Sequence, residues 1–350
     1  MTELTANERE TLNNVIEGLA LAISRSGELE SDAVTKTSKT KLEKFIFQAL
    51  ADTDELDSIT YSWYIAGAKT DTPNSELSIG ALENAFNRVT GQTASPDVQK
   101  EFVDSRSDYN PIPEVERFAE YFLREFDLED SWFTRGEMYL LDFYKERAPE
   151  DLRDLYVAVQ ELRNTLNYAI REIRRVKTDS PNEMTLSQFQ VSSEVKGPDL
   201  YEEVADLVSE IHLQMAMDEQ LKPLLSDFKA FSDILEDAFL ALSQMNVERL
   251  SDSQLQMFQS LRRFYFYEAW KLPSYAISMR TASGPRAEDL KVRHAQEIEQ
   301  HREEYKDKLE ALRQDAASSA LVPTATDYPC LSEDTPHIES LVERYLTTAK

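Results

Sequence analysis

Apolar side chains recur at helical spacing through most of this 350-residue chain. The clearest pattern lies in residues 149–176, where apolar positions alternate three and four residues apart. Its members are Leu152, Leu155, Val159, Leu162, Leu166, Ala169, Ile173 and Val176. This heptad pattern predicts a long helix, beginning at Pro149, that packs within a bundle or against a second copy of the chain.

Similar but shorter patterns predict helices before and after this segment. They centre on residues 5–24, 40–50, 82–91, 96–102, 115–126, 138–144, 200–215, 225–242 and 255–265. A very polar helix is predicted over residues 286–315, with one narrow stripe on its surface. The stripe consists of Leu290, His294, Ile298, His301, Tyr305, Leu309 and Leu312.

One stretch departs from helical spacing. From Ile59 to Ile65 large side chains alternate with smaller or more polar ones, which predicts a short, half-buried strand. Before it, Thr40 and Glu43 form a predicted capping box at the start of a helix. After it, Gly67 and Pro73 are expected to bracket a turn or loop, and Pro273 is expected to help close the helical body.

These patterns predict an all-α fold: a multi-helix bundle with long heptad-patterned helices and one short strand in its N-terminal module. Breaks rich in proline, glycine or polar residues divide the chain into four predicted segments. They are an N-terminal helical module over 1–110, a helical bundle body over 111–284, a polar coiled-coil-like helix over 285–316, and an extended tail with a short terminal helix over 317–350.

The charge composition adds a prediction about the kind of cell in which the protein works. The chain has 65 acidic and 38 basic residues, a net charge of -27, and the acids are spread along its whole length. This composition resembles that of proteins from salt-accumulating halophilic archaea, in which molar salt shortens the Debye length to about 3 Å and screens self-repulsion. The alternative is an ordinary acidic protein that avoids nucleic acid.

The single cysteine, Cys330, excludes an intramolecular disulfide and is typical of an intracellular protein. The N-terminus lacks the positive start and apolar core of a signal peptide, and no apolar run is long enough to span a bilayer. The sequence therefore predicts a soluble cytoplasmic protein that does not enter the membrane.

No catalytic, cofactor-binding or metal-binding residue is predicted. His294 and His301 are one heptad apart, roughly 10 Å along a helix, which is too far for both to bind one ion. Cys330 and His337 lie in the predicted tail, which offers no rigid scaffold for a nucleophile and its base. The basic cluster around Arg174 is better explained by attraction to the negative C-terminal end of its helix than by a contact with phosphate. Binding to nucleic acid is therefore disfavoured.

Residues Lys41 to Val89 resemble a known family. They open with Lys41-Leu42-x-Lys44-Phe45-x-Phe47-x-Ala49, continue through Ile59, Tyr61 and Tyr64 to Gly67, and end in a further helix. This pattern resembles the Panacea (SocA-type) antitoxin-like domain, although Ala68 stands where the family's proline is expected. Members of that family are helical interaction modules that neutralise or regulate partner proteins, and the resemblance implies such a role here.

The predicted partner-binding residues come from this stretch and from the polar helix. They are Lys41, Lys44, Tyr61, Trp63, Tyr64, His294, His301 and Tyr305. The expected partner is a protein, such as a toxin or a regulatory target, and self-association is a further expectation.

Three hypotheses about function stay open. The leading one is a non-enzymatic regulatory or interaction protein, antitoxin-like, of a halophilic archaeon. The second is a DNA-associated transcriptional regulator with a winged-helix-like N-terminal module, although no basic recognition face is evident. The third is an enzyme whose carboxylates converge only in three dimensions.

Overall fold

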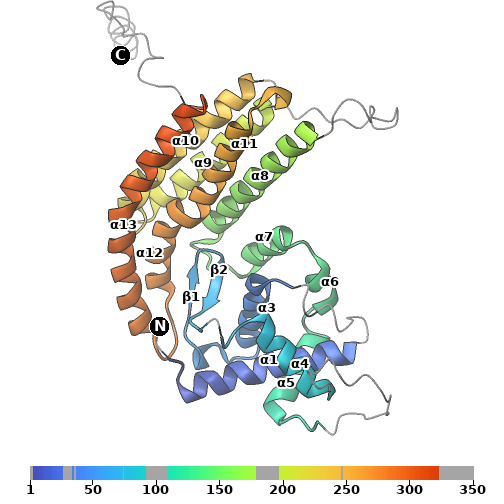
Figure 1. Cartoon of the computed structure of the whole chain (residues 1–350). Coiled ribbons are helices and arrows are strands. Elements are labelled where there is room, and N and C mark those ends of the chain that lie inside the picture. The colour runs from blue at the N-terminus through green and yellow to red at the C-terminus, as the bar shows by residue number, and fades with distance from the viewer. Residues whose placement is uncertain are drawn as a thin grey trace, which may run out of the picture. The chain divides into compact units, whose positions relative to one another are not determined.

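The computed structural model of the chain describes residues 3–26, 34, 37–73, 75–91, 109–178, 197–245 and 247–322. Within these residues helices dominate and the β-structure is a two-stranded sheet, as Figure 1 shows, so the predicted all-α, multi-helix fold is confirmed. The helix expected after Ser95 and the tail with Cys330 and His337 lie outside the described residues.

The chain forms two compact units. The first consists of residues Met1–Asn164, Leu207–Phe228 and Phe266–Tyr305, and the second of residues Thr165–Asp206, Lys229–Tyr265 and Lys306–Lys350. Each unit therefore draws on several of the four segments predicted from the sequence, and those segment boundaries stay predictions.

The first unit begins with four helices whose apolar faces form a shared core. They are α1 (Ala6–Ser26), α3 (Lys39–Asp52), α4 (Ile79–Thr90) and α5 (Pro113–Arg124). Helices α1 and α5 approach closely at Gly18, where a Cβ would collide with Phe118. Helix α4 ends as predicted, because Gly91 adopts the left-handed conformation with a φ of 71°.

The start of α3 differs from the prediction. Its N-cap is Ser38, whose side chain accepts a hydrogen bond from the backbone N–H of Lys41 at 3.2 Å, while Thr40 lies inside the helix. Serine is as good a cap as threonine, so the helix extends to the earlier of the two residues. A reciprocal pair of hydrogen bonds between Thr5 and Glu8 caps α1 in the way that was expected for α3.

The predicted strand is half of a hairpin. After the short 3₁₀ helix η1 (Leu56–Ser58), β1 (Tyr61–Tyr64) pairs with antiparallel β2 (Gly67–Thr70), and Tyr61 lies opposite Thr70. The expectation of a turn or loop from Gly67 onward was therefore wrong: the reversal comes at residues 65–66, and Gly67 begins β2 with a φ of 81°.

Further helices complete the first unit. They are α6 (Leu128–Phe133), α7 (Gly136–Arg147), the start of α8 (Arg153–Thr178), the end of α9 (Gly197–Met217), η2 (Lys222–Leu224), α12 (Lys271–Thr281) and the first half of α13 (Ala287–Ser318). Strand β1 lies against α12 (Figure 1), and its Trp63 N–H donates to the Thr281 hydroxyl at 2.8 Å. The long helix begins at Arg153 rather than at Pro149, and its predicted apolar stripe is buried from Leu152 to Ile173.

The second unit contains the remaining helical residues, including most of α10 (Leu225–Gln244), η3 (Val247–Arg249) and α11 (Asp252–Phe264). Its core combines aliphatic and aromatic side chains, and the rings of Phe231 and Phe264 stack in it with centroids 5.4 Å apart. A capping box between Ser251 and Gln254 begins α11.

A single π-helical turn, Tyr265–Ala269, follows α11 and leads into α12. The expectation that Pro273 helps to close the helical body was wrong. This proline occupies the first turn of α12, where its missing N–H costs no intrahelical hydrogen bond. No helix among the described residues is both long and apolar enough to cross a bilayer.

Candidate functional site

The two lysines of the predicted site are buried in the first unit. Lys41 lies on α3 and donates from Nζ to the carbonyl oxygens of Trp132 at 2.7 Å and Thr134 at 2.8 Å. These carbonyls belong to the last turn and the cap of α6, where a cation meets the negative end of the helix dipole. Burial nevertheless lowers the pKa of Lys41, and nearby Asp130 opposes this shift.

Lys44 has no exposed surface at all. Its Nζ donates to the carbonyl oxygen of Ala68 in β2 and lies 5.8 Å from the centre of the Phe143 ring. Desolvation lowers the pKa of this amine to about 8, against the opposing attraction of Glu43. Lys44 therefore ties α3 to the hairpin at an electrostatic cost.

The aromatic residues of β1 complete this interior. Trp63 is buried and stacks on Phe143 with ring centroids 5.7 Å apart, while the ring of Tyr61, half-buried, meets Phe47 at 5.6 Å. The Tyr156 hydroxyl donates to the backbone oxygen of Tyr64 at 2.8 Å and so holds the end of the strand.

Tyr64 and His294, predicted from distant parts of the sequence, lie in contact. Their rings stack with centroids 5.1 Å apart, and Tyr275 of α12 meets the same imidazole at 5.2 Å. Burial lowers the pKa of His294 to about 4, Arg293 adds to this shift, and Asp71 opposes it. The imidazole is therefore neutral at pH 7, and its buried Nδ1 makes no hydrogen bond within the described residues.

The other two residues of the polar helix anchor it further along. His301 Nε2 lies 3.0 Å from the Glu268 backbone oxygen, in the π-helical turn, and the Tyr305 hydroxyl donates to the Asp227 backbone oxygen at 2.9 Å. Burial raises the pKa of Tyr305, so its hydroxyl keeps its proton.

Six of the eight predicted partner-binding side chains are thus buried, and Tyr61 and Tyr64 are half-buried. Each of the eight makes a contact inside the first unit. Their binding to a partner stays a prediction, but their burial and contacts give them a role in holding the fold.

A cluster of charged and polar side chains with a buried centre joins α1, the hairpin and α13, and the sequence did not predict it. We call it the clasp; its members are Glu8, Thr60, Asp71, Arg286 and Arg293. Glu8 is fully buried and accepts from Arg286 Nε at 2.7 Å and from the Thr60 hydroxyl at 2.7 Å. Burial alone raises the pKa of Glu8, but hydrogen bonds from Arg286, Thr5 and Thr60 outweigh it and hold the value at about 2.

The chain reaches the clasp through a glycine in a backbone conformation that other residues rarely adopt. Gly284 has a φ of 96°, and a Cβ there would collide with the carbonyl of Ile59. Beside it, the backbones of Tyr61 and Ser283 exchange two hydrogen bonds of 3.0 Å. A Gly-Pro-Arg sequence before a polar helix was the available signal for this contact.

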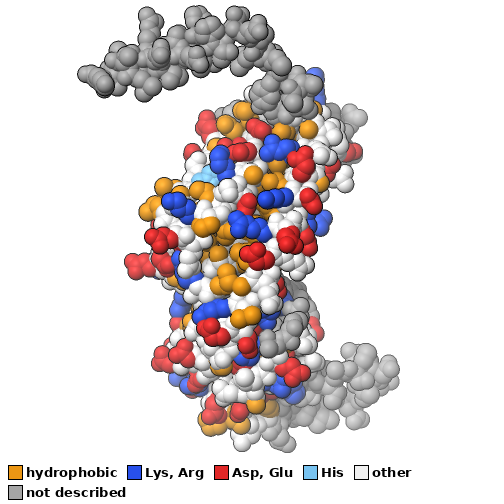
Figure 2. All heavy atoms as spheres, turned by 90° about the vertical axis from the view of Figure 1, so that its left-hand side faces the viewer, with side chains coloured by type: hydrophobic (Ala, Val, Ile, Leu, Met, Phe, Trp, Pro, Cys, Tyr) orange, Lys and Arg blue, Asp and Glu red, His pale blue; other side chains and the backbone are white. Residues whose placement is uncertain are grey.

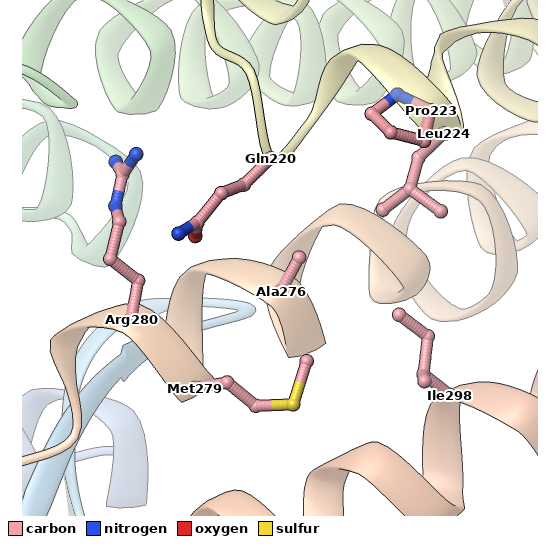
Figure 3. Close-up of a pocket in the computed structure, with 7 residues that line it drawn as sticks. All are labelled: Gln220, Pro223, Leu224, Ala276, Met279, Arg280 and Ile298. Carbon is pink, nitrogen blue, oxygen red and sulfur yellow. The ribbon is translucent and has the colours of Figure 1, made fainter.

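An open groove lies elsewhere in the first unit, between α12, α13 and the η2 turn (Figure 3). Its volume is about 420 Å³, and its lining consists of Gln220, Pro223, Leu224, Ala276, Met279, Arg280 and Ile298. Leu224, Met279 and Ile298 point toward one another across the open space, whereas the Arg280 guanidinium points away from it. The floor is therefore apolar, and the polar groups stand at one end.

The arginine side chains near the groove form ion pairs with carboxylates. Arg280 contacts Asp218 through Nη1 and lies 3.1 Å from Asp151 through Nη2. On α13, Arg302 donates to Asp227 at 3.1 Å and to the backbone oxygen of Pro223 at 3.3 Å. The Arg302 contacts tie η2 to α13, and the Arg280 contacts tie Asp218, which precedes η2, to α12.

A second hollow, of about 340 Å³, lies at the start of α4 and is mostly polar, with Asn13, Ser75 and Ser78 among its lining residues. Its Arg88 donates to Glu17 at 2.6 Å. Because water solvates such a lining well, the apolar groove is the better candidate for a docking site. Among the described residues, no group of three or more His, Cys, Asp or Glu side chains is placed to hold a metal ion.

Sequence reasoning found Ile298 as part of a stripe and missed the rest of the groove. The turn that contains Gln220 and Pro223 lies far along the chain from Met279 and Ile298, and only folding brings these segments together.

Comparison with known proteins gives one family. The model of a domain of unknown function, DUF8098, matches residues 1–347, so the chain belongs to that family. No curated protein and no solved structure matches the chain.

Proposed function

We propose that this member of the DUF8098 family is a non-enzymatic protein-interaction protein, and that the groove between α12, α13 and η2 receives apolar side chains of a partner protein. The observation that carries the proposal is the groove's apolar floor. Met279 and Ile298 are partly exposed beside an open space, which Leu224, only 4% exposed, also borders. Burying such surface is favourable by roughly 25 cal/mol per Å², so a partner with a matching apolar segment gains free energy there.

The mixed charge of the surface also supports binding of a protein. On the face drawn in Figure 2, acidic and basic side chains are interspersed with hydrophobic ones instead of gathering by sign. Protein interfaces typically combine an apolar centre with a polar, mixed-charge rim, and the paired Arg280 and Arg302 supply such a rim.

The regulatory side of the proposal rests on the resemblance of Lys41 to Val89 to Panacea antitoxin-like domains. A cytoplasmic setting is proposed from the single Cys330, and a halophilic source from the net charge of -27. In this proposal the N-terminal helices and hairpin are held together by Lys41, Lys44 and the aromatic residues of β1. The groove makes the contact with the partner protein.

Site-specific photocross-linking tests the proposal. A benzophenone amino acid replaces exposed Gln220 at the groove, and in a matched chain it replaces Val292, which is exposed on α13 outside the groove. In a native lysate we expect one defined protein adduct at position 220, lost when Met279→Ser and Ile298→Ser are combined, and absent at position 292.

The partner identified in this way must then bind the purified full chain. Equal adducts at both positions, or an adduct at position 220 that survives the two serine substitutions, would contradict the proposal. The circular dichroism spectrum and melting temperature of the double variant show whether it has kept its fold.

A further inference from the structure

One arginine of α8 is held by an aromatic ring instead of a carboxylate. Arg163 is half-buried, and its guanidinium carbon lies 3.7 Å from the centre of the Phe266 ring. Within the described part of the chain its nitrogen atoms make no hydrogen bond and no ion pair, and solvent reaches them. A guanidinium that stacks through its face keeps its N–H donors at its edge, so these donors are available to a ligand.

Other half-buried arginines of the first unit differ from Arg163. Each of three such side chains forms an ion pair with a carboxylate: Arg147 with Asp52, Arg280 with Asp218, and Arg293 with Asp71. The chain has 65 acidic residues against 38 basic ones, so an acidic neighbour is the expected arrangement. The positive charge of Arg163 is therefore uncompensated by any described residue in contact with it.

The sequence around this pair of residues is also locally basic. Residues 157–169 and 260–272 contain the bases Arg163, Arg262, Arg263 and Lys271 and the acids Glu161 and Glu268. Four bases against two acids leave an excess of two positive charges, in a chain of net charge -27. Glu161 precedes Arg163 by two residues, a spacing at which side chains of a helix do not face each other. Glu268 lies 3.5 Å from the His301 ring.

The ring under the guanidinium belongs to a fixed platform, the π-helical turn Tyr265–Ala269. Phe266 is half-buried, Tyr267 is 58% exposed, and their rings meet edge to face with centroids 5.2 Å apart. A backbone carbonyl of the turn lies 3.0 Å from His301 Nε2, and Trp270, directly after the turn, is fully buried. Single π-helical turns inside α-helices are frequent at functional sites, and this one presents two aromatic rings beside a guanidinium.

Other ligands fit less well. A nucleic-acid base would need a free ring face, and Arg163 already covers a face of Phe266. A polyanion or a second copy of the chain would also meet a net charge of -27 and be repelled at ordinary ionic strength. A protein segment with one or two carboxylates carries too little charge for this repulsion to prevent a direct contact.

We infer that Arg163 and Tyr267 form a contact site for an acidic segment of a partner protein. An Asp or Glu carboxylate of the partner pairs with the Arg163 guanidinium, and a neighbouring apolar side chain lies on Tyr267. Phe266 positions the guanidinium, whose edge suits a carboxylate through two parallel N–H donors. Arginine and tyrosine are enriched among the residues that dominate protein interfaces. The site shares no residue with the groove, so it does not depend on the proposed function.

NMR of the full chain, isotope-labelled on its arginine side chains, tests the inference. The probe is the capped dipeptide Asp-Phe, and its match is the capped dipeptide Asn-Phe, which has nearly the same shape without the charge. We expect the Asp peptide to shift the Arg163 Nε–H signal and to bind at least about threefold more tightly than the Asn peptide at about 0.15 M KCl. Loss of the signal in Arg163→Lys assigns it.

Variants separate this site from general attraction of acids to bases. Arg163→Lys keeps the charge but loses the paired donors, and Phe266→Leu removes the ring under the guanidinium. Each should weaken binding of the Asp peptide by about threefold, measured from the peptide's saturation-transfer signal, with the fold checked by circular dichroism. The matched Arg135→Lys changes an exposed arginine at the start of α7 and should leave binding unchanged.

An Arg163 signal that moves no further than that of Arg135, or equal binding of the Asp and Asn peptides, would overturn the inference. If inorganic phosphate shifts the Arg163 signal at lower concentration than the Asp peptide does, the ligand carries phosphate and the inference fails. If sedimentation shows a dimer that Arg163→Lys dissociates, the occupant is a second copy, and the inference fails as well.

A groove variant distinguishes this inference from the proposed function. Met279→Ser combined with Ile298→Ser should remove the adduct at position 220 and leave binding of the Asp peptide unchanged. Loss of peptide binding in this variant would place the peptide in the groove and contradict a separate site at Arg163. An adduct that survives the two serine substitutions contradicts the proposed function alone.

Discussion

The clasp and the groove, both in the first unit, use charged side chains in opposite ways. In the clasp, Glu8 and Arg286 are almost completely buried, and each is bound by several partners. In the groove, Arg280 and its carboxylates stand at the rim around an apolar floor. Buried charges in this unit therefore connect elements of the fold, whereas partly exposed apolar side chains form the surface that is proposed to bind a partner.

The largest expected effect breaks the clasp. Arg286→Met leaves the Glu8 carboxylate buried without its guanidinium, and we expect a loss of about 3–5 kcal/mol in the free energy of unfolding, measured by chemical denaturation. Combining Glu8→Gln with Arg286→Met removes both charges and should restore much of the loss.

Arg293→Met is the matched control for this prediction. Arg293 also contacts Asp71, but its side chain is 26% exposed, so we expect a loss of about 1 kcal/mol or less. A loss as large as that of Arg286→Met would show that burial is not what distinguishes the two pairs.

Lys44 sharpens the comparison, because it is a buried charge held by a carbonyl instead of a carboxylate. Its pKa is lowered from 10.5 to about 8 in the folded chain, so the unfolded state binds more protons between these values. Stability should therefore rise as pH rises from about 8 to 10.5, by an amount on the order of 3 kcal/mol. Lys44→Met should abolish this rise in denaturation curves measured across the window.

The buried His294 gives a change of similar size, but in the acid range. Its pKa is lowered from 6.5 to about 4, so the unfolded state binds more protons in this interval and stability falls as pH falls through it. Glu8, with its pKa at about 2, adds a loss only below pH 4.5. His294→Phe keeps a ring against Tyr64 and should flatten the stability profile between pH 6.5 and 4; an unchanged slope there would contradict the assignment.

The smallest expected effect on stability comes from the groove. Met279 and Ile298 are already partly exposed, so replacing both with serine should lower the free energy of unfolding by only about 1–2 kcal/mol. Val292→Ser should change it by less than about 0.5 kcal/mol. A large loss for the double variant would mean that the groove residues are part of the core.

The helical class could be predicted from the sequence because apolar spacing reports one buried face per helix. The stripe of α13 was found in this way, including the contact-making His294 and Tyr305. The second strand was missed because Gly67 and Lys69 carry no alternating apolar signal, and the hairpin is held by α3 and α12 instead. Neither the clasp nor the groove could be predicted, because Glu8 and Arg286, like Leu224 and Ile298, are joined only by the tertiary fold.

Hydrogen exchange of the full chain, free and with the partner captured at position 220, tests the central claim most directly. The account predicts slower exchange for amides of residues 220–224, 276–280 and 295–302, with amides of residues 41–47 and 61–64 unchanged. Slower exchange confined to residues Lys41 to Val89, with the groove segments unchanged, would contradict it.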